Sequence, residues 1–271
     1  MADAAQTAPA NKLVLTTRQN GVATLTLNRP ERLNALNAEL GVALSEALEQ
    51  VAADEEIRVV VVTGRGRAFC AGGDLSTIRS SRDRGATAEL EPLLRAGQKM
   101  VMTMRTMRQP VIAAVNGAAA GGGMNVALAA DIRIAAHDAL FAQSFVKIGL
   151  FPDYGGTFLL PRLVGEARAA EMFYTGNLID AQTALRLGIV NRVVPAAQLA
   201  DEARALAEQI AGGPPLAIRA VKQVLFAADR EELSRALERE VRTQIECFHS
   251  EDCSEGLRAF FEKRVPQFRG R

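Results

Sequence analysis

Short apolar runs that suit β-strands alternate along this chain with longer stretches of helical periodicity. Runs at residues 13–17 and 22–27 are rich in Val, Leu and Thr and flank Asn20-Gly21, a pair typical of a tight hairpin turn. Further strands are expected at residues 59–63, 111–115, 132–135, 140–142 and 190–194. Helices are expected up to residue 53 and over residues 87–107, 157–163, 167–175 and 181–187. This alternation predicts an α/β fold.

The pattern changes in two places. Residues 76–85 are polar, and we expect them to be mobile. From residue 196 onward the pattern is wholly helical, with Gly212-Gly-Pro-Pro215 as its clearest break. We therefore expect a disordered tail over residues 1–11, an α/β domain over 12–197 and a helical C-terminal region over 198–271.

Two glycine-rich turns follow predicted strands. Gly121, Gly122 and Gly123 stand between the strand at 111–115 and a small-residue helix that starts near residue 122. Gly72 and Gly73 form the second turn, and Asp74 after them is placed as a helix N-cap. Glycine costs a helix about 1 kcal/mol relative to alanine, so three in succession require a reason. Either helix and sheet pack tightly there, or backbone N–H groups contact a ligand at the positive end of a helix.

Composition removes several classes of function. The 32 basic and 31 acidic residues nearly cancel, so no nucleic-acid or membrane-surface partner is expected. The three cysteines share no metal-ligand spacing, and no metal site is expected; their odd number fits a reducing cytoplasm. The first residues lack the features of a secretion signal, and no apolar run reaches the roughly 20 residues that span a bilayer.

Familiar catalytic motifs are missing from the glycine turns. Phe69 occupies the place of the third glycine in a dinucleotide fingerprint, and no P-loop or nucleophile elbow occurs. Two glycine turns that present backbone N–H groups suggest instead an oxyanion hole, which serves acyl transfer or enolate formation. No Ser or Cys nucleophile is evident, so enolate chemistry is favoured. That chemistry requires a group that transfers protons, most simply a carboxylate.

Several motifs occur together in an order that resembles the enoyl-CoA hydratase/isomerase (crotonase) superfamily, over about residues 12–265. They are Asn28-Arg-Pro, Asn34-Ala-Leu36, Ala68-Phe-Cys-Ala-Gly-Gly-Asp74, Ala113-Ala-Val-Asn-Gly117 with Gly121 to Gly123, Ala130-Asp-Ile-Arg-Ile-Ala135, and Ile148-Gly-Leu-Phe-Pro-Asp153 followed by Gly155-Gly-Thr-Phe-Leu-Leu-Pro-Arg162. The resemblance implies a spiral of ββα units with a helical C-terminal trimerisation region. It implies an acyl-CoA thioester substrate, with coenzyme A as part of the substrate and no separate cofactor, and a homotrimer that can pair into a dimer of trimers.

The same resemblance assigns site residues. Gly73 and Gly122 match the two oxyanion positions. Ala71 matches the position whose backbone meets the adenine, and Asp74, Leu75 and Ala118 would line the pocket. Arg29 or Arg32 would meet the phosphates of coenzyme A, although a solvated loop charge explains either equally well. Lys263 matches a basic residue of the closing segment that can approach coenzyme A, but lysines at helix ends are usually just solvated.

The chain departs from the hydratases of this family at both of their glutamates. Asn125 stands at the first position and Phe145 at the second. Asparagine can hydrogen-bond a water but cannot take its proton, and phenylalanine can do neither. Asp153 remains, at a place similar to the carboxylate of the family's isomerases, and burial there would raise its pKa toward the working pH. The alternative is that Asp153 merely turns the chain before Gly155.

We therefore expect a cytoplasmic acyl-CoA isomerase in which Asp153 moves a proton along an enolate held by Gly73 and Gly122. One alternative is an enoyl-CoA hydratase in which Asn125 and another group replace the glutamates. A second alternative is a non-catalytic acyl-CoA-binding protein. The oxyanion glycines do not separate these hypotheses, whereas Asp153 does.

Overall fold

The computed structural model describes residues 12–85, 90–227 and 229–271. The tail expected over residues 1–11 and the first residues of the helix expected from residue 87 lie outside these ranges.

Two sheets organise the described chain. The larger has six strands in the order β1 (Val14–Gln19), β2 (Val22–Leu27), β3 (Val59–Gly64), β5 (Val111–Val115), β7 (Ile132–Ala136) and β10 (Arg192–Val194). β1 and β2 pair antiparallel through the turn at Asn20-Gly21, where both residues have positive φ, and the later strands pair in parallel. The hairpin prediction is confirmed, since this turn requires a left-handed backbone that Asn-Gly readily adopts.

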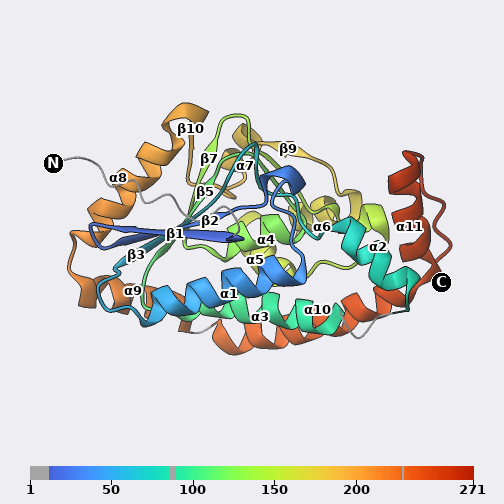
Figure 1. Cartoon of the computed structure of the whole chain (residues 1–271), viewed down its shortest axis with the longest axis horizontal. Helices are drawn as coiled ribbons and strands as arrows, with labels where there is room; N and C mark the ends of the chain where they lie inside the picture. Colours follow the sequence, from blue (N-terminus) through green and yellow to red (C-terminus); the bar gives the residue numbers. More distant parts are fainter. Residues whose placement is uncertain (1–11, 86–89, 228) are drawn as a thin grey trace.

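The smaller sheet has four short strands in the order β4 (Ala68–Cys70), β6 (Ala118–Ala120), β8 (Leu140–Ala142) and β9 (Ile179–Asp180). β4, β6 and β8 each follow a strand of the larger sheet in the chain. Helices α2 (Leu75–Asp83) and α3 (Leu90–Thr106) follow β4, and α4 (Gly122–Ala129) follows β6. This repetition of a long strand, a short strand and a helix is the spiral of ββα units expected from the sequence (Figure 1).

The faces of the larger sheet are covered differently because successive side chains of a strand point in opposite directions. Val59 and Val61 of β3 pack against α8 (Leu199–Ala211), whereas Val60 and Val62 join the main core. Figure 1 shows α1 (Ala38–Ala53), α3 and α10 (Arg230–His249) side by side along the molecule, and the first and last of these both contact α3. α4 lies inside this core, where every one of its residues is buried.

The remaining helices connect the strands or close the C-terminal region. They are η1 (Pro30–Arg32), η3 (Ser144–Ile148), α5 (Gly156–Val164), α6 (Glu166–Thr175), α7 (Ala181–Arg186), η4 (Ala196–Gln198), α9 (Pro215–Ala227) and α11 (Glu251–Glu262). The boundary expected between residues 197 and 198 stays a prediction. α8, the first α-helix after that boundary, packs on the larger sheet.

Two short elements were not predicted. The polar segment over residues 76–85, for which no helix was expected, contains most of α2. Asp74 caps this helix and Ser81 is its one buried residue, so its exposed face is polar and shows no apolar periodicity. The mobility of this segment stays a prediction. The short strand β6 was not predicted, because its alanines lack the β-branched residues typical of strands.

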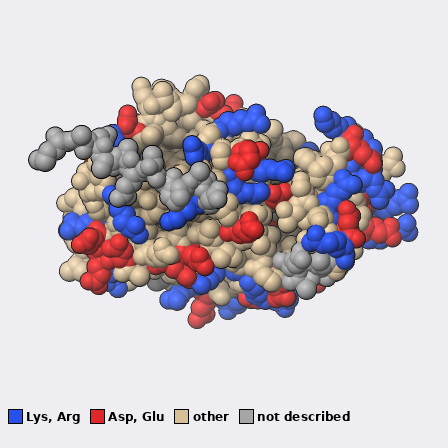
Figure 2. All heavy atoms as spheres, viewed as in Figure 1, with Lys and Arg blue, Asp and Glu red and all other residues tan. Residues whose placement is uncertain are grey.

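The distribution of charge over the surface agrees with the composition. Figure 2 shows Lys and Arg interspersed with Asp and Glu over the visible face, in keeping with 32 basic and 31 acidic residues in the chain. Within the described ranges, no helix combines the length and apolar character that crossing a bilayer requires.

Candidate active site

The two glycine turns lie against each other at the carboxyl ends of β4 and β6. A β-carbon on Gly72 would lie 2.7 Å from the Ala120 carbonyl oxygen, and one on Gly123 would overlap the carbonyl oxygen of Cys70. Two backbones therefore meet there at a distance that excludes any side chain. Tight packing, one of the two reasons considered for the glycines, holds for Gly72 and Gly123.

The backbone N–H groups of Gly73 and Gly122 are free within the described part of the chain. The parallel bridge between Leu36 and Gly73 uses the carbonyl of Gly72 and the N–H of Asp74, which leaves the Gly73 N–H outside it. Gly122 is the first residue of α4, so its N–H has no partner within the helix. Among the described residues, neither N–H has an acceptor. Both glycines line one cavity of about 1100 Å³.

Asp153 lies at the α4 end of this cavity. A β-carbon built on Gly122 would lie 3.4 Å from Asp153 Oδ1 and 3.3 Å from Cδ2 of Tyr154. Asp153 Oδ2 accepts a hydrogen bond from Gln244 Nε2 at 3.2 Å. Its Oδ1 is inaccessible to solvent and has no partner among the described residues. The carboxylate therefore has one free oxygen next to the open end of a helix.

Burial and a neighbouring carboxylate change the proton affinity of this group. Desolvation, with the charge of Glu240 as a second cause, raises the pKa of Asp153 to about 8. The sequence predicted the rise by burial, and the structure adds Glu240, which no motif indicated. An acid whose pKa lies near neutrality can both accept and return a proton.

Asn125 supports the backbone of Asp153. Its Nδ2 donates to the Asp153 carbonyl oxygen at 2.7 Å, and its Oδ1 accepts from Gln143 Nε2 at 2.7 Å. Gly156 packs directly on this amide, where a β-carbon would overlap it. From the sequence, Asn125 was a candidate for binding water. In the structure, each of its polar side-chain atoms has a protein partner. Phe145, at the second position, lines the cavity.

Helix α10 contributes two polar residues that the sequence analysis missed. Glu240 is 1% exposed and Gln244 is 3% exposed, and both interact with the segment around Asp153. A signal for them did exist. The buried positions of α10 recur with helical spacing at Leu233, Leu237 and Val241, and Glu240 and Gln244 fall on the same buried face. Polar residues on an apolar stripe indicate a specific hydrogen-bonding role.

The other predicted residues divide into two groups. Arg32, Ala71, Asp74 and Leu75 line the cavity, whereas Arg29, Ala118 and Lys263 are not among its lining residues. Arg29 instead donates to the Ala35 carbonyl at 2.7 Å and pairs with Asp74 Oδ2 at 3.1 Å. Ala118 pairs with Ala68 between β6 and β4, and Lys263 ends α11 in a left-handed conformation.

Asp74 has the N-cap role expected of it, and Asp131 is a second carboxylate with a structural role. Asp74 Oδ1 accepts from the N–H groups of Ser76 and Thr77 at the start of α2. Asp131 Oδ2 accepts from the Val111 N–H at 2.7 Å and from Lys222 Nζ at 2.8 Å. Both carboxylates are therefore engaged by cations and amides. Asp131 Oδ1 is also buried without a partner among the described residues, but Asp131 does not line the cavity, whereas Asp153 does.

Comparison with known proteins identifies the fold and the family. A profile described as enoyl-CoA hydratase/isomerase matches residues 17–271. The chain belongs to the enoyl-CoA hydratase/isomerase family. It is similar to 1,2-epoxyphenylacetyl-CoA isomerase of Escherichia coli, with 42% identity over 96% of this chain and 99% of that protein. It is also similar to a probable enoyl-CoA hydratase of Rhodobacter capsulatus, with 45% identity over 93% and 95%.

Among solved structures, an enoyl-CoA hydratase from Mycobacterium avium subsp. paratuberculosis superposes with a TM-score of 0.86 and 33% identity, covering 95% of this chain and 98% of that one. The fold is therefore the crotonase fold, with two sheets and C-terminal helices, as predicted. The chain is an enzyme of this family that acts on acyl-CoA. Its relatives include isomerases and hydratases, so family membership leaves the reaction open.

Proposed function

We propose that this enzyme is an acyl-CoA isomerase that shifts a double bond, or rearranges a ring-derived acyl-CoA, through an enolate. The observation that carries the proposal is the free Oδ1 of Asp153, which lies beside the first residue of α4 in the cavity. No other carboxylate that lines the described cavity combines this position with a free buried oxygen: Asp74 is engaged by Arg29 and α2, and Glu31 is exposed.

The N–H groups of Gly73 and Gly122 are proposed to hold the thioester oxygen. Asp153 then removes a proton from the carbon chain, and the electron pair of the broken C–H bond moves into the thioester, which places negative charge on that oxygen. The same carboxyl group returns the proton two carbons along, where the π pair of the original C=C bond forms the new C–H bond. The pair held in the enolate then becomes the new C=C bond, and the thioester carbonyl is restored. Hydrogen-bond donors of this kind are typically worth about 2.7–4 kcal/mol each in the barrier.

We propose fewer residues for acyl-CoA binding than the sequence suggested. Ala71, Asp74, Leu75 and Arg32 line the cavity and keep their proposed role. Arg29 is better explained as the partner of Asp74, which it holds at the start of α2. Ala118 is engaged in the pairing of β6 with β4, which gives it no part in the cavity lining.

Hydration is less well supported, although relatives of comparable identity carry hydratase names. A hydratase needs a group that takes a proton from water. Asn125 cannot do so, and it is occupied by Asp153 and Gln143. The similarity to an isomerase of 42% identity agrees with the single free carboxylate.

The experiment is incubation of 3-enoyl-CoA and 2-enoyl-CoA with the purified enzyme in heavy water. We expect interconversion of the two, with deuterium at the carbons that exchange protons and no hydroxyacyl product. The variant Asp153→Asn should lose at least about 100-fold in rate, the usual contribution of a general base, while acyl-CoA binding is retained. Asp138→Asn, at an exposed carboxylate on a turn, is the matched control and should keep the wild-type rate. A wild-type rate in Asp153→Asn, or rapid hydroxyacyl-CoA formation, would overturn the proposal.

The proposal includes a homotrimer, which can pair into a dimer of trimers. Support comes from α9, where Val221, Val224 and Leu225 are more than half exposed at spacings of three and four residues. Such a stripe on a helix is typical of a surface covered by another subunit.

A further inference from the structure

One turn of α10 holds both ends of the segment that carries Asp153. Glu240 binds the residues after Asp153, and Gln244 binds both Asp153 and a residue before it. The two side chains are four residues apart and therefore lie on the same face of the helix. We propose that Glu240 is a positioning residue for Asp153: from α10 it fixes the turn that carries this carboxylate, and it places a second buried carboxyl group against that turn. This inference rests on the proposed role of Asp153.

The contacts of Glu240 explain how the turn is fixed. Its Oε2 accepts from the Gly155 N–H at 2.7 Å, and its Oε1 accepts from the Thr157 N–H at 3.0 Å and from the Thr157 hydroxyl. These N–H groups belong to the start of α5, whose N-cap Gly155 offers no side chain. Glu240 is thus a cap supplied by a different helix, and a carboxylate is favoured there by the helix dipole.

The turn needs such support because its backbone is strained. Tyr154 has φ of 52° and Gly155 has φ of 79°, so two successive residues are left-handed. For a residue with a side chain this conformation costs roughly 1–2 kcal/mol. Tyr154 also lies against Gly97 of α3, where a β-carbon would overlap its ring. The turn is therefore held between α3 on one side and α10 on the other.

Gln244 complements Glu240 at the other end of the segment. Its Oε1 accepts from the Phe151 N–H at 2.8 Å, and its Nε2 donates to Asp153 Oδ2 at 3.2 Å. The direction of Asp153 is thus fixed through one of its oxygens. The other oxygen, Oδ1, is buried and has no hydrogen-bond partner among the described residues.

The charges around the pair are few. Burial raises the pKa of Glu240 to about 7, although the hydrogen bonds from Thr157 and Gly155 and, least of all, the charge of Arg239 lower it. Glu240 in turn raises the pKa of Asp153, and Asp153 raises that of Tyr154. α4 contains no ionisable residue, and Arg162 of α5 pairs with Asp229 and Glu232. After burial, the like charge of Glu240 is the next largest cause of the raised pKa of Asp153.

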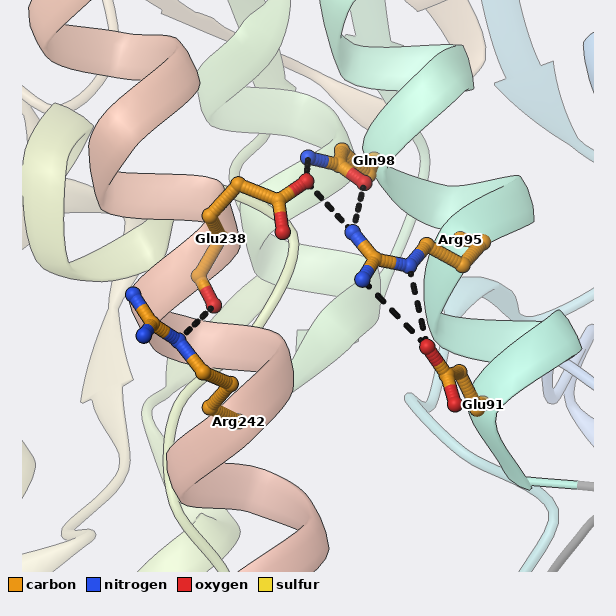
Figure 3. Close-up of polar contacts among 5 residues, drawn as sticks. All are labelled: Glu91, Arg95, Gln98, Glu238 and Arg242. Carbon is orange, nitrogen blue, oxygen red and sulfur yellow. Dashed lines mark hydrogen bonds and ion pairs between the residues drawn. The ribbon is translucent and has the colours of Figure 1, made fainter.

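A separate polar network holds α10 against α3 and supplies a control. Figure 3 shows Arg95 and Gln98 of α3 in contact with Glu238, and Arg95 also in contact with Glu91. The Glu238 side chain is 43% exposed, and none of its contacts reaches the segment of Asp153. Exposed pairs of this kind typically contribute less than about 1 kcal/mol. Glu238 therefore offers a carboxylate two residues from Glu240 that lacks the proposed function.

The test is a carboxyl ¹³C NMR titration of the full-length enzyme, with Asp153 assigned by the loss of its resonance in Asp153→Asn. We compare wild type, Glu240→Gln and the control Glu238→Gln. Loss of a neighbouring negative charge favours the ionised form, so Glu240→Gln should shift the Asp153 titration to lower pH by about one unit. Glu238→Gln should leave it unchanged. An unshifted Asp153 titration in folded Glu240→Gln would overturn the assigned effect of charge.

The pH dependence of kcat/KM provides a second measurement. Asp153 acts as a base when ionised, so activity rises with pH through its pKa, and this rise should move to lower pH in Glu240→Gln with KM changed less than twofold. Glu240→Asp keeps the charge but shortens the side chain. It should leave the rise in place and lower kcat at least tenfold. An unchanged kcat in Glu240→Asp would overturn the positioning role. This test remains decisive even if Glu240→Gln does not fold.

The titration does not require turnover. If the wild-type enzyme shows no isomerisation while the Asp153 resonance shifts as expected, the proposed function fails and the coupling of the two carboxylates stands. If isomerisation depends on Asp153 but Glu240→Gln leaves both measurements unaltered, the proposed function stands and the role of Glu240 is refuted.

Discussion

The two glycine turns lead into helices whose N-termini differ: a side chain caps α2, and no side chain caps α4. At the start of α2, Asp74 accepts hydrogen bonds from Ser76 and Thr77, so the first N–H groups of that helix are satisfied by its own N-cap. At the start of α4, Gly121 occupies the N-cap position and supplies no side-chain oxygen. α2 is largely exposed, whereas α4 is buried along its whole length.

This difference distinguishes a glycine required for packing from one proposed to contact the substrate. A capped helix end has little further affinity for negative charge, while an uncapped, buried one leaves its N–H groups and its dipole directed at whatever lies in front. In front of α4 lie the cavity and Asp153. Gly123, by contrast, meets the backbone of Cys70, and its requirement is steric. Similar sequence patterns thus serve packing at Gly123 and, in the mechanism proposed above, chemistry at Gly122.

The largest effect is expected where the two turns touch. In Gly123→Ala the new methyl group overlaps the carbonyl of Cys70, which is backbone and cannot move aside. Overpacking of this kind typically costs about 1–3 kcal/mol or more, so the free energy of unfolding in a denaturant titration should fall by at least this amount. Gly73→Ala is the matched control, because its methyl group meets only the end of the Ile78 side chain at 2.9 Å. Equal stability losses in both variants would contradict the assigned packing role.

The second effect concerns activity without a matching loss of stability. In Gly122→Ala the methyl group enters the space between α4, Tyr154 and Asp153. Alanine gains up to about 1 kcal/mol in a helix, which offsets this crowding. We expect the free energy of unfolding to stay within about 1 kcal/mol of wild type while kcat falls at least tenfold. Wild-type turnover in this variant would exclude Gly122 from the site of reaction.

The smallest effect is expected at the cap of α2. Asp74→Ala removes the N-cap and leaves the guanidinium of Arg29, 14% exposed, without its carboxylate. Loss of an N-cap costs about 0.5–2 kcal/mol, and this is the decrease expected in the free energy of unfolding. Asp74→Asn keeps an acceptor for Ser76 and Thr77 and should lose less. If both substitutions cost the same, the ion pair and not the cap stabilises this turn.

Sequence reasoning succeeded where the signal is local. Asn20-Gly21 identified the hairpin and Asp74 the start of a helix, because each depends on the conformation or side chain of the residue itself. It failed for α2, whose side chains are mostly solvated. It also failed for Glu240, which lies more than 80 residues from Gly155, to which it is bonded. No local pattern specifies which distant backbone a buried carboxylate will meet.

The amino-acid sequence by itself determined the strands of the larger sheet, the glycine turns, and the replacement of the two hydratase glutamates by Asn125 and Phe145, since these follow from periodicity and residue type. Only the tertiary structure decided which N–H groups remain free, that Asn125 holds the backbone of Asp153, and that α10 surrounds this carboxylate with Glu240 and Gln244. The physical reason is that hydrogen-bond partners and proton affinity depend on distance and burial, which arise when remote segments pack together.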